Sequence, residues 1–308
     1  MRDSTYSWDE LSEFFTESLV SSVVERDAEL GGKTTYRSGG ECSVFIEVGS
    51  PSDLHVIASR TKGLQYPVVV LGNGSNLLVS DFGFDGLILQ LGSSFSSLTI
   101  EGEVVVAGGA ANLPIVARKS VTAGLTGFEW AVGVPGSIGG AVRMNAGGHG
   151  SDMSKCVKKV EGVNLNSAEL FSFELSELDF SYRNSSITKD HVITEVVLEL
   201  EKGETRKSER ELSEIVRWRI ENQPGGQNAG SVFTNPKNDS AGRLIEAAGC
   251  KGLRVGTASV SAKHANFIQV DQGGSSEDVM ALMDEVRSRV LAEFGIQLTP
   301  ENHFLGFG

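Results

Sequence analysis

A short run of small residues between two apolar segments could hold a phosphate group through its backbone. The run follows the apolar segment 68–71 and precedes the apolar segment 77–79. Its residues are Gly72, Asn73, Gly74, Ser75 and Asn76. Glycines let several backbone N–H groups point at one place, and Ser75 and Asn76 add side-chain donors. Such a concave set of donors binds an anion without a positive charge. The alternative interpretation is a plain hairpin turn between two strands.

A second glycine-rich segment is longer and more apolar. Residues 127–148 contain seven glycines in 22 residues, and Phe, Trp, Val, Ile and Met residues stand between them. A flexible linker would instead be polar and rich in serine. The composition favours backbone pressed against a large, flat, mostly apolar ligand such as a nucleotide-like cofactor, and the alternative is packing between glycine-rich turns. Neither segment is a Rossmann GxGxxG or a P-loop motif, so the standard routes to nucleotide binding are not expected.

A third segment, residues 230–236, presents the polar side chains of Ser231 and Asn235 on a turn. The chain contains no GxSxG motif, and its five histidines show no Ser/His/Asp order that would indicate a hydrolase. A metal helix of the HExxH type is also absent, so no metal site is expected. Taken alone, Ser231 is typical of a turn residue rather than of a catalyst.

The elements that must position these segments follow from apolar periodicity, and they predict an α+β protein. Expected helices cover residues 8–30, 51–61, 112–124, 209–222, 240–248 and 276–294. Expected strands cover residues 43–48, 67–71, 77–79, 87–91, 98–100, 104–107, 157–165, 168–173 and 192–200. The polar stretch 202–208 reads as a linker, and Ser275 with Asp278 predicts a capping box. We expect domains at 1–92, 93–205 and 206–308.

The chain's composition excludes several classes of protein. It has 308 residues, with 27 Lys+Arg against 40 Asp+Glu and a net charge of −13, which disfavours binding to nucleic acid or an anionic membrane. Neither a signal peptide nor an apolar run of membrane-spanning length is visible. The three cysteines are far apart and form no CxxC, so disulfides or structural zinc are not expected, and a cytoplasmic location fits best.

The ordered set of motifs resembles one family, the UDP-N-acetylenolpyruvoylglucosamine reductases, from about Tyr36 to Gly306. Any one motif is weak, and the order of all of them is specific. The matching segments are 36–40, 71–79, 133–140, 144–147, 182–185, 230–236, 240–246, 263–267 and 294–296. No long insertion separates residue 183 from the third domain, so the chain looks like the shorter family type that lacks a tyrosine-bearing loop.

The resemblance implies a fold, a cofactor and a reaction. The fold is a two-part FAD-binding domain of the vanillyl-alcohol oxidase-like type, followed by an α+β substrate-binding domain. NADPH reduces the flavin, which passes hydride to UDP-N-acetylglucosamine enolpyruvate and yields UDP-N-acetylmuramate for peptidoglycan synthesis in the bacterial cytoplasm. The protein is expected to be a monomer. The residues implied to contact FAD are Gly72, Asn73, Gly74, Ser75, Asn76, Gly133, Pro135, Gly136, Ser137, Gly139, Gly140, Asn145, Gly147 and Arg219.

The resemblance also assigns residues to the chemistry. Hydride addition to one alkene carbon leaves negative charge on the other, delocalised into the neighbouring carboxylate, and this charge needs a fixed cation or acid. Arg183 matches the family arginine that stabilises it, and Glu301 matches the glutamate that helps polarise the enol system. Ser231 matches the serine that delivers the proton, and Asn235 would bind substrate. A strongly basic enolate makes geometry more important for Ser231 than a histidine partner.

Three positions depart from the family pattern. Asn222 and Thr234 stand where many members have lysine, which raises the question of how the substrate diphosphate is held. His303 stands where arginine is common, and histidine titrates near neutral pH as arginine does not. Two alternatives therefore remain: an FAD oxidase with another substrate, and a flavin-binding relative that has lost catalysis.

Overall fold

The computed structural model describes residues 7–63 and 66–307. The chain folds into two compact units. Unit 1 contains the described residues of 1–28, 43–73 and 86–217, and unit 2 those of 29–42, 74–85 and 218–308. Within the described part of the chain, no helix is long and apolar enough to cross a membrane. The boundaries at 92 and 205 remain a prediction, and two separate sheets of unit 1 lie mainly on either side of residue 92.

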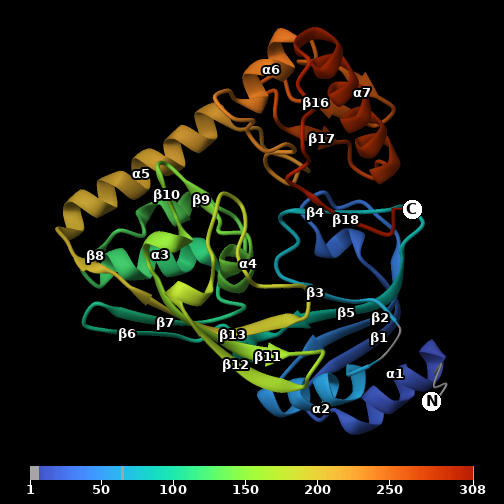
Figure 1. Ribbon diagram of the computed structural model, residues 1–308, viewed down its shortest axis with the longest axis vertical. Coiled ribbons are helices and arrows are strands. Elements are labelled where there is room, and N and C mark those ends of the chain that lie inside the picture. Colours follow the sequence, from blue (N-terminus) through green and yellow to red (C-terminus); the bar gives the residue numbers. More distant parts are fainter. Residues whose placement is uncertain (1–6, 64–65, 308) are drawn as a thin grey trace. The chain divides into compact units, whose positions relative to one another are not determined.

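The first sheet lies mainly in unit 1 and has the strand order β1-β2-β5-β3 (Figure 1). Its short strand β3 runs parallel to β5, with Val68 opposite Leu87. Two helices pack their apolar side chains, Phe15 and Ile57 among them, into one core with β2 and β5. The elements are α1 (Trp8–Ser18), β1 (Val23–Glu29), β2 (Glu41–Val48), α2 (Pro51–Thr61), β3 (Val68–Leu71) and β5 (Phe84–Leu91).

The first helix is shorter than predicted, and the prediction of a helix over 8–30 was wrong. The helix ends at Ser18, and β1 follows, with partly buried and exposed residues alternating along most of its length. The carboxylate of Asp53 accepts hydrogen bonds from the backbone of Val20 and Ser21 and from the hydroxyl of Ser22. These bonds hold the backbone extended where the helix would have continued, and the β-branched valines after them favour a strand.

The second sheet of unit 1 is antiparallel and has the order β12-β11-β13-β7-β6 (Figure 1). The expected strands at 98–100 and 104–107 are confirmed, and they pair as a hairpin with Glu101 opposite Val104. The strands are β6 (Leu98–Glu101), β7 (Val104–Gly108), β11 (Val157–Asn164), β12 (Glu169–Glu174) and β13 (His191–Glu199). Its core is completed by α3 (Leu113–Thr122), α4 (Ile138–Arg143) and the 3₁₀ helix η3 (Glu129–Gly133). Short pairs are β8 (Leu125–Thr126) with β14 (Glu201–Lys202), and β9 (Gly147–Gly148) with β10 (Ser151–Asp152).

The predicted linker at 202–208 is also wrong. Lys202 pairs with Leu125 in β14–β8, and α5 (Thr205–Asn222) begins four residues before the predicted start. Packing explains the difference, because a Cβ at Gly203 would lie 2.6 Å from the Cβ of Thr126. Polar composition alone did not reveal that this stretch pairs with β8 and then continues directly into a helix.

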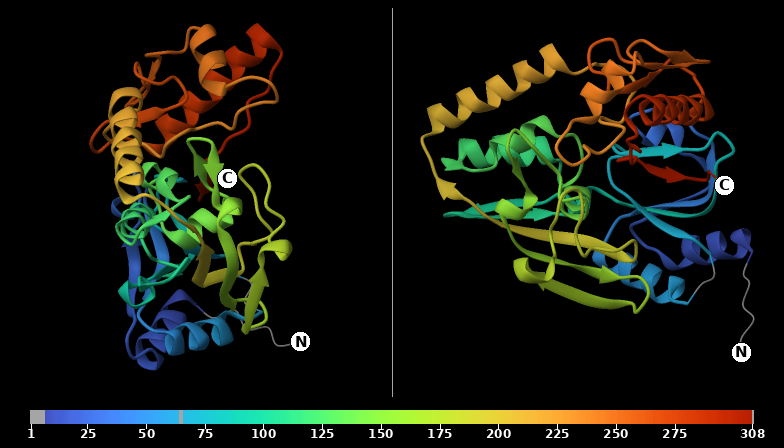
Figure 2. Two further views of the ribbon diagram at one scale, coloured as in Figure 1. Left: turned by 90° about the vertical axis from the view of Figure 1, so that its left-hand side faces the viewer. Right: turned by 45° about the horizontal axis from the view of Figure 1, so that its top comes forward.

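Unit 2 is built around α7 (Ser276–Phe294), which packs on a three-stranded antiparallel sheet (Figure 2). The sheet consists of β15 (Arg254–Val255), β16 (Ala258–Val260) and β17 (Ile268–Val270). The helix α6 (Ala241–Ala247) shares the same core. A separate parallel pair joins β4 (Leu77–Val79) to β18 (His303–Leu305). Further 3₁₀ turns are η1 (Gly31–Lys33), η2 (Ser93–Phe95), η4 (Met153–Lys155) and η5 (Leu175–Glu177).

Helix α7 begins and ends where the sequence predicts, although its cap differs. The Ser275 hydroxyl accepts from the backbone of Glu277 and Asp278, as an N-cap does. The Asp278 carboxylate does not complete a capping box, because it accepts from the backbone N–H and hydroxyl of Thr257. The side chain therefore ties the helix to the start of β16.

Candidate functional site

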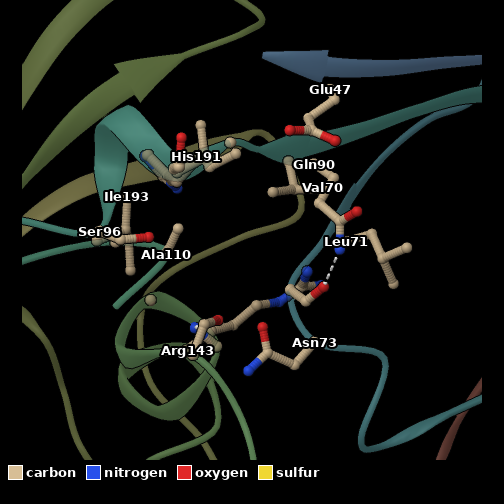
Figure 3. A pocket seen from close by; sticks show the side chains of 18 of the residues that line it. Glu47, Val70, Leu71, Asn73, Gln90, Ser96, Ala110, Arg143, His191 and Ile193 are labelled. Carbon is tan, nitrogen blue, oxygen red and sulfur yellow. Dashed lines mark hydrogen bonds between the residues drawn. The ribbon is translucent and has the colours of Figure 1, made fainter. Parts of the chain in front are cut away.

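A cavity of about 250 Å³ lies within unit 1 (Figure 3). Its wall combines the ends of β3 and β5, the start of β13 and one side of α4. Five of the residues that the sequence assigns to FAD line it together, from segments more than sixty positions apart: Gly72, Asn73, Ser137, Gly139 and Gly140. The two glycine-rich segments therefore meet at one place, as the cofactor prediction requires.

Close backbone approach explains why small residues stand in this wall. A Cβ at Gly72 would lie 2.7 Å from the Ser137 hydroxyl oxygen, and one at Gly139 would lie 3.0 Å from the Gly109 carbonyl. Ser137 caps α4, since its hydroxyl accepts from the backbone N–H of Gly140 at 3.3 Å. Side chains at these glycines would fill the narrow space between the loop and the helix.

The first glycine run is not a hairpin. Strand β3 before it pairs with β5, and strand β4 after it pairs with β18. Most of the apolar residues of the second segment, such as Trp130 and Ile138, are buried in the core of unit 1. Packing thus explains those apolar residues, while the glycines of α4 face the cavity.

Four polar cavity residues were missed by the sequence analysis: Glu47, Gln90, Arg143 and His191. The amide of Gln90 donates to the Gly72 carbonyl at 2.7 Å and so fixes the loop from behind (Figure 3). Gln90 and His191 sit in ordinary strand patterns that gave no signal. Arg143 did carry one, because it is the only basic residue between positions 127 and 148.

Burial lowers the pKa of both basic residues of the cavity, Arg143 and His191. At Arg143 the charge of nearby Asp190 offsets only part of this lowering of the pKa. At His191 the charge of Asp190 again opposes the lowering of the pKa. The Nδ1 of His191 accepts from the Thr188 backbone N–H at 3.1 Å, and the Asn164 amide nitrogen lies 3.3 Å from Nε2. The cavity thus disfavours positive charge unless an anion balances it.

Other residues of unit 1 that the sequence assigns to FAD lie outside the cavity wall. They are Gly133, Pro135, Gly136, Asn145 and Gly147. Asn145 is 3% exposed, and its amide bridges two backbone segments. It donates to the Ser181 carbonyl at 2.9 Å and accepts from the Ser154 N–H at 3.1 Å. This side chain therefore holds the turn that carries Arg183.

The turn around Arg183 is tight and strained. Ser181 and Asn184 exchange backbone hydrogen bonds of 3.0 and 3.1 Å across it. Arg183 has a φ of +57°, in the left-handed region that favours glycine. Its guanidinium lies 5.3 Å from the centroid of the Tyr182 ring. Glycine would adopt this conformation without the steric cost that a Cβ adds.

Unit 2 brings Ser231 and Glu301 onto neighbouring backbone segments. The Val232 carbonyl accepts from the Glu301 N–H at 2.8 Å, and Phe233 forms a bridge with Pro300. On its other side the segment is fixed by buried Asn266, whose amide accepts from the Phe233 N–H and donates to its carbonyl. The Asn235 side-chain oxygen accepts from the Ala241 N–H at the start of α6, and this residue is exposed.

The remaining assigned residues, Gly74, Ser75, Asn76 and Arg219, belong to unit 2. The Asn76 amide donates to the Glu301 carbonyl at 3.0 Å and accepts from Asn302 at 2.8 Å. It therefore positions the Glu301 segment. The Arg219 guanidinium donates to Gln223 at 3.0 Å, and burial lowers its pKa.

The three positions that depart from the family pattern are also accounted for locally. The Asn222 amide donates to the Trp218 carbonyl at 2.8 Å, and the Thr234 hydroxyl donates to the Thr299 carbonyl at 3.2 Å. Neither side chain offers a cation. His303 is exposed at the start of β18, and its backbone N–H donates to the Asn76 carbonyl.

Two family models match the chain. Residues 42–172 match the FAD binding domain, and residues 221–305 match the C-terminal domain of UDP-N-acetylenolpyruvoylglucosamine reductase. The cavity lies largely in the first region, and its glycine-lined wall beside a half-buried arginine suits a phosphate-bearing group. The α+β prediction is confirmed, and the protein is an FAD-containing oxidoreductase.

Relatives over nearly the whole length define the family more closely. The UDP-N-acetylenolpyruvoylglucosamine reductase of Heliobacterium modesticaldum is 41% identical over 276 residues, 89% of this chain and 88% of that protein. The Bacillus subtilis protein of the same name is 35% identical, covering 94% and 99%. The crystal structure of the Thermus caldophilus reductase (MurB) superposes with a TM-score of 0.81 at 34% identity, covering 92% and 99%. The chain belongs to the UDP-N-acetylenolpyruvoylglucosamine reductase family.

Proposed function

We propose that the protein reduces the enolpyruvyl ether of UDP-N-acetylglucosamine to UDP-N-acetylmuramate in peptidoglycan synthesis, with Arg183, Ser231 and Glu301 acting on the substrate. Bound FAD supplies the hydride, which it takes from NADPH. One observation carries the proposal. In this chain, which belongs to the reductase family, the Ser231 segment is hydrogen-bonded to the Glu301 segment. That pairing gives a single small region both a proton donor and a carboxyl group.

Arg183 stabilises the charge that hydride transfer creates. The enolate carries its negative charge into the substrate carboxylate, and a guanidinium binds a carboxylate with two parallel hydrogen bonds. Its strained turn, held by Asn145, fixes the direction of the side chain before the reaction. A preorganised cation of this kind costs no reorganisation at the moment of reaction.

Ser231 delivers the proton that quenches the enolate, and Glu301 helps to polarise the enol system. The serine has no hydrogen-bonded histidine among the described residues to activate it. Proton transfer must therefore depend on how closely its hydroxyl is placed to the enolate. Gly230, with a φ of +75°, precedes it, and the Val232–Glu301 bond follows it. Asn235 binds substrate through its amide nitrogen, which makes no hydrogen bond to a described residue.

FAD is held in part by the cavity of unit 1. Pockets for drug-sized ligands enclose about 300–1,000 Å³, so a cavity of about 250 Å³ takes only a section of a dinucleotide. Gly72, Asn73, Ser137, Gly139 and Gly140 form its contacts within the cavity, and the other residues assigned to FAD contact the rest of the dinucleotide. The division into two FAD subdomains and a substrate domain belongs to the same proposal.

We also propose that the protein acts in the cytoplasm as a monomer without nucleic-acid partners. Cys42, Cys156 and Cys250 are all buried free thiols, which suits a reducing compartment. The net charge of −13 opposes binding to nucleic acid. Size-exclusion chromatography with light scattering tests the monomer, because a dimer would double the mass of 32.8 kDa.

An anaerobic visible spectrum of the purified protein tests the function. The yellow flavin band should bleach with NADPH and recover when the enolpyruvyl substrate is added. Bleaching without recovery would keep the flavin and remove the substrate assignment, which would favour an oxidase with another substrate. A protein that takes up no FAD would contradict the proposal altogether.

A further inference from the structure

Arg143 lies in the cavity wall, although the sequence analysis gave it no role. We propose that its guanidinium binds the diphosphate of FAD, an inference that rests on the proposed placement of the cofactor in this cavity. The residue occupies the last turn of α4, in the segment that also contributes Ser137, Gly139 and Gly140. A positive charge therefore lies beside the backbone donors of the glycine loops.

The charge of Arg143 has no hydrogen-bonded or ion-pair partner in the part of the chain that the structure describes. Its side chain makes no hydrogen bond or ion pair with any residue in the described ranges, although it is half-buried. The carboxylate of Asp190 acts on it only at longer range. A guanidinium cannot shed its proton as lysine can, so burial leaves a charge that needs an anion.

The loop at Gly72 and Asn73 lies on the same side of the cavity as Arg143. Figure 3 shows the Arg143 side chain extending from α4 toward Asn73. The Gly72 carbonyl would repel a phosphate, but it is occupied by the amide of Gln90. The Gly72 carbonyl is therefore already hydrogen-bonded, and the arginine places a positive charge beside the loop.

The opposite side of the cavity has different chemistry. Glu47 lies across from Arg143 in Figure 3 and is exposed at the rim. A carboxylate there repels phosphate and accepts hydrogen bonds from sugar hydroxyls. The two sides thus orient the dinucleotide, with its diphosphate toward Arg143 and a hydroxyl-bearing sugar portion toward Glu47.

The test is the affinity for FAD, measured by flavin fluorescence as holoprotein is diluted. Arg143→Met should weaken FAD binding about 10- to 100-fold, the effect of losing charge-assisted bonds to a phosphate. Arg143→Lys keeps the charge without the bidentate geometry and should lose less. Arg118→Met, an equal change on the exposed face of α3, should leave the dissociation constant unchanged.

Competition with fragments identifies the group that Arg143 contacts. The dissociation constant of ADP, obtained from competition after allowing for the changed FAD affinity, should rise in Arg143→Met, whereas that of adenosine should be the same in both proteins. Unchanged FAD affinity in Arg143→Met, or equal losses for ADP and adenosine, would overturn the inference while leaving a flavin reductase intact. A parent protein that binds no FAD would instead overturn the proposed function.

Discussion

The Arg183 turn of unit 1 and the Ser231 segment of unit 2 position their side chains by opposite means. The turn keeps a non-glycine residue at a φ of +57° and is held from outside by Asn145. The Ser231 segment has extended neighbours whose backbone groups are paired on both sides, by Asn266 and by Glu301. The Arg183 turn has a strained backbone, whereas the Ser231 segment is fixed by hydrogen bonds.

The difference suits the task proposed for each side chain. An arginine proposed to stabilise a new charge has a long, flexible side chain, and a strained, anchored backbone limits the directions it can take. A serine has a short side chain, so its oxygen is placed by the backbone itself. Precision for Ser231 therefore comes from a fully bonded segment rather than from strain.

The largest expected effect comes from Ser231→Ala, which removes the proton donor and leaves the segment's backbone bonds in place. Substrate turnover should fall about 10²- to 10⁴-fold, the range for loss of a general acid. Reduction of the flavin by NADPH should keep its rate, because it does not use this proton. Stopped-flow spectra of the two half-reactions measure both, and equal turnover in the variant would remove Ser231 from the mechanism.

Asn266→Ala tests the bonded side of the comparison. Asn266 is 3% exposed, and its loss would leave both the N–H and the carbonyl of Phe233 buried without those partners. Each such group costs about 1–3 kcal/mol, so the free energy of unfolding should fall by about 2–5 kcal/mol. Urea unfolding measures this change.

A surface amide provides the control for Asn266. Gln272 is exposed and makes no hydrogen bond to a residue within the described ranges, so Gln272→Ala should stay within about 0.5 kcal/mol of the parent. If Asn266→Ala were equally neutral, the hydrogen-bonded account of the Ser231 segment would be wrong.

Arg183→Gly tests the strained side. Glycine adopts a φ of +57° freely, so relief of strain should raise the free energy of unfolding by about 1 kcal/mol while activity is lost. Arg183→Ala removes the same guanidinium and keeps the strain. It should therefore lose activity without any gain in stability. Equal unfolding free energies for the two variants would show that the turn stores no strain.

The sequence predicted individual helices and strands better than the boundaries that depend on distant residues. Local periodicity gave the α6 and α7 helices and the β6–β7 hairpin because those elements depend on nearby residues. The early end of α1 depends on Asp53, which lies more than thirty residues away, so no local pattern contained it. The start of α5 depends on packing of Gly203 against Thr126.

The site shows the same division. Motif order located the glycine loops, and the cavity unites five of their residues. Arg143 stood out in the sequence only as the one basic residue between positions 127 and 148, and the lack of a side-chain partner among the described residues became visible only in three dimensions. Asn76 and Asn145 were assigned to FAD by resemblance, and their amides are bonded to backbone of the Glu301 and Arg183 segments. Whether they also touch the cofactor remains a prediction.

The smallest expected effect is a pH dependence from His191 in the cavity wall. Burial lowers the pKa of His191 in the folded protein below its value in the unfolded chain. The unfolded state therefore binds more protons near pH 6, and stability is full above about pH 6.5 and falls as the solution is acidified. Urea midpoints between pH 7.5 and 5.5 should decline less for His191→Gln, whereas exposed His55→Gln should follow the parent. An unchanged decline in His191→Gln would mean that other groups cause it, and that burial of this ring contributes nothing to the pH dependence of stability.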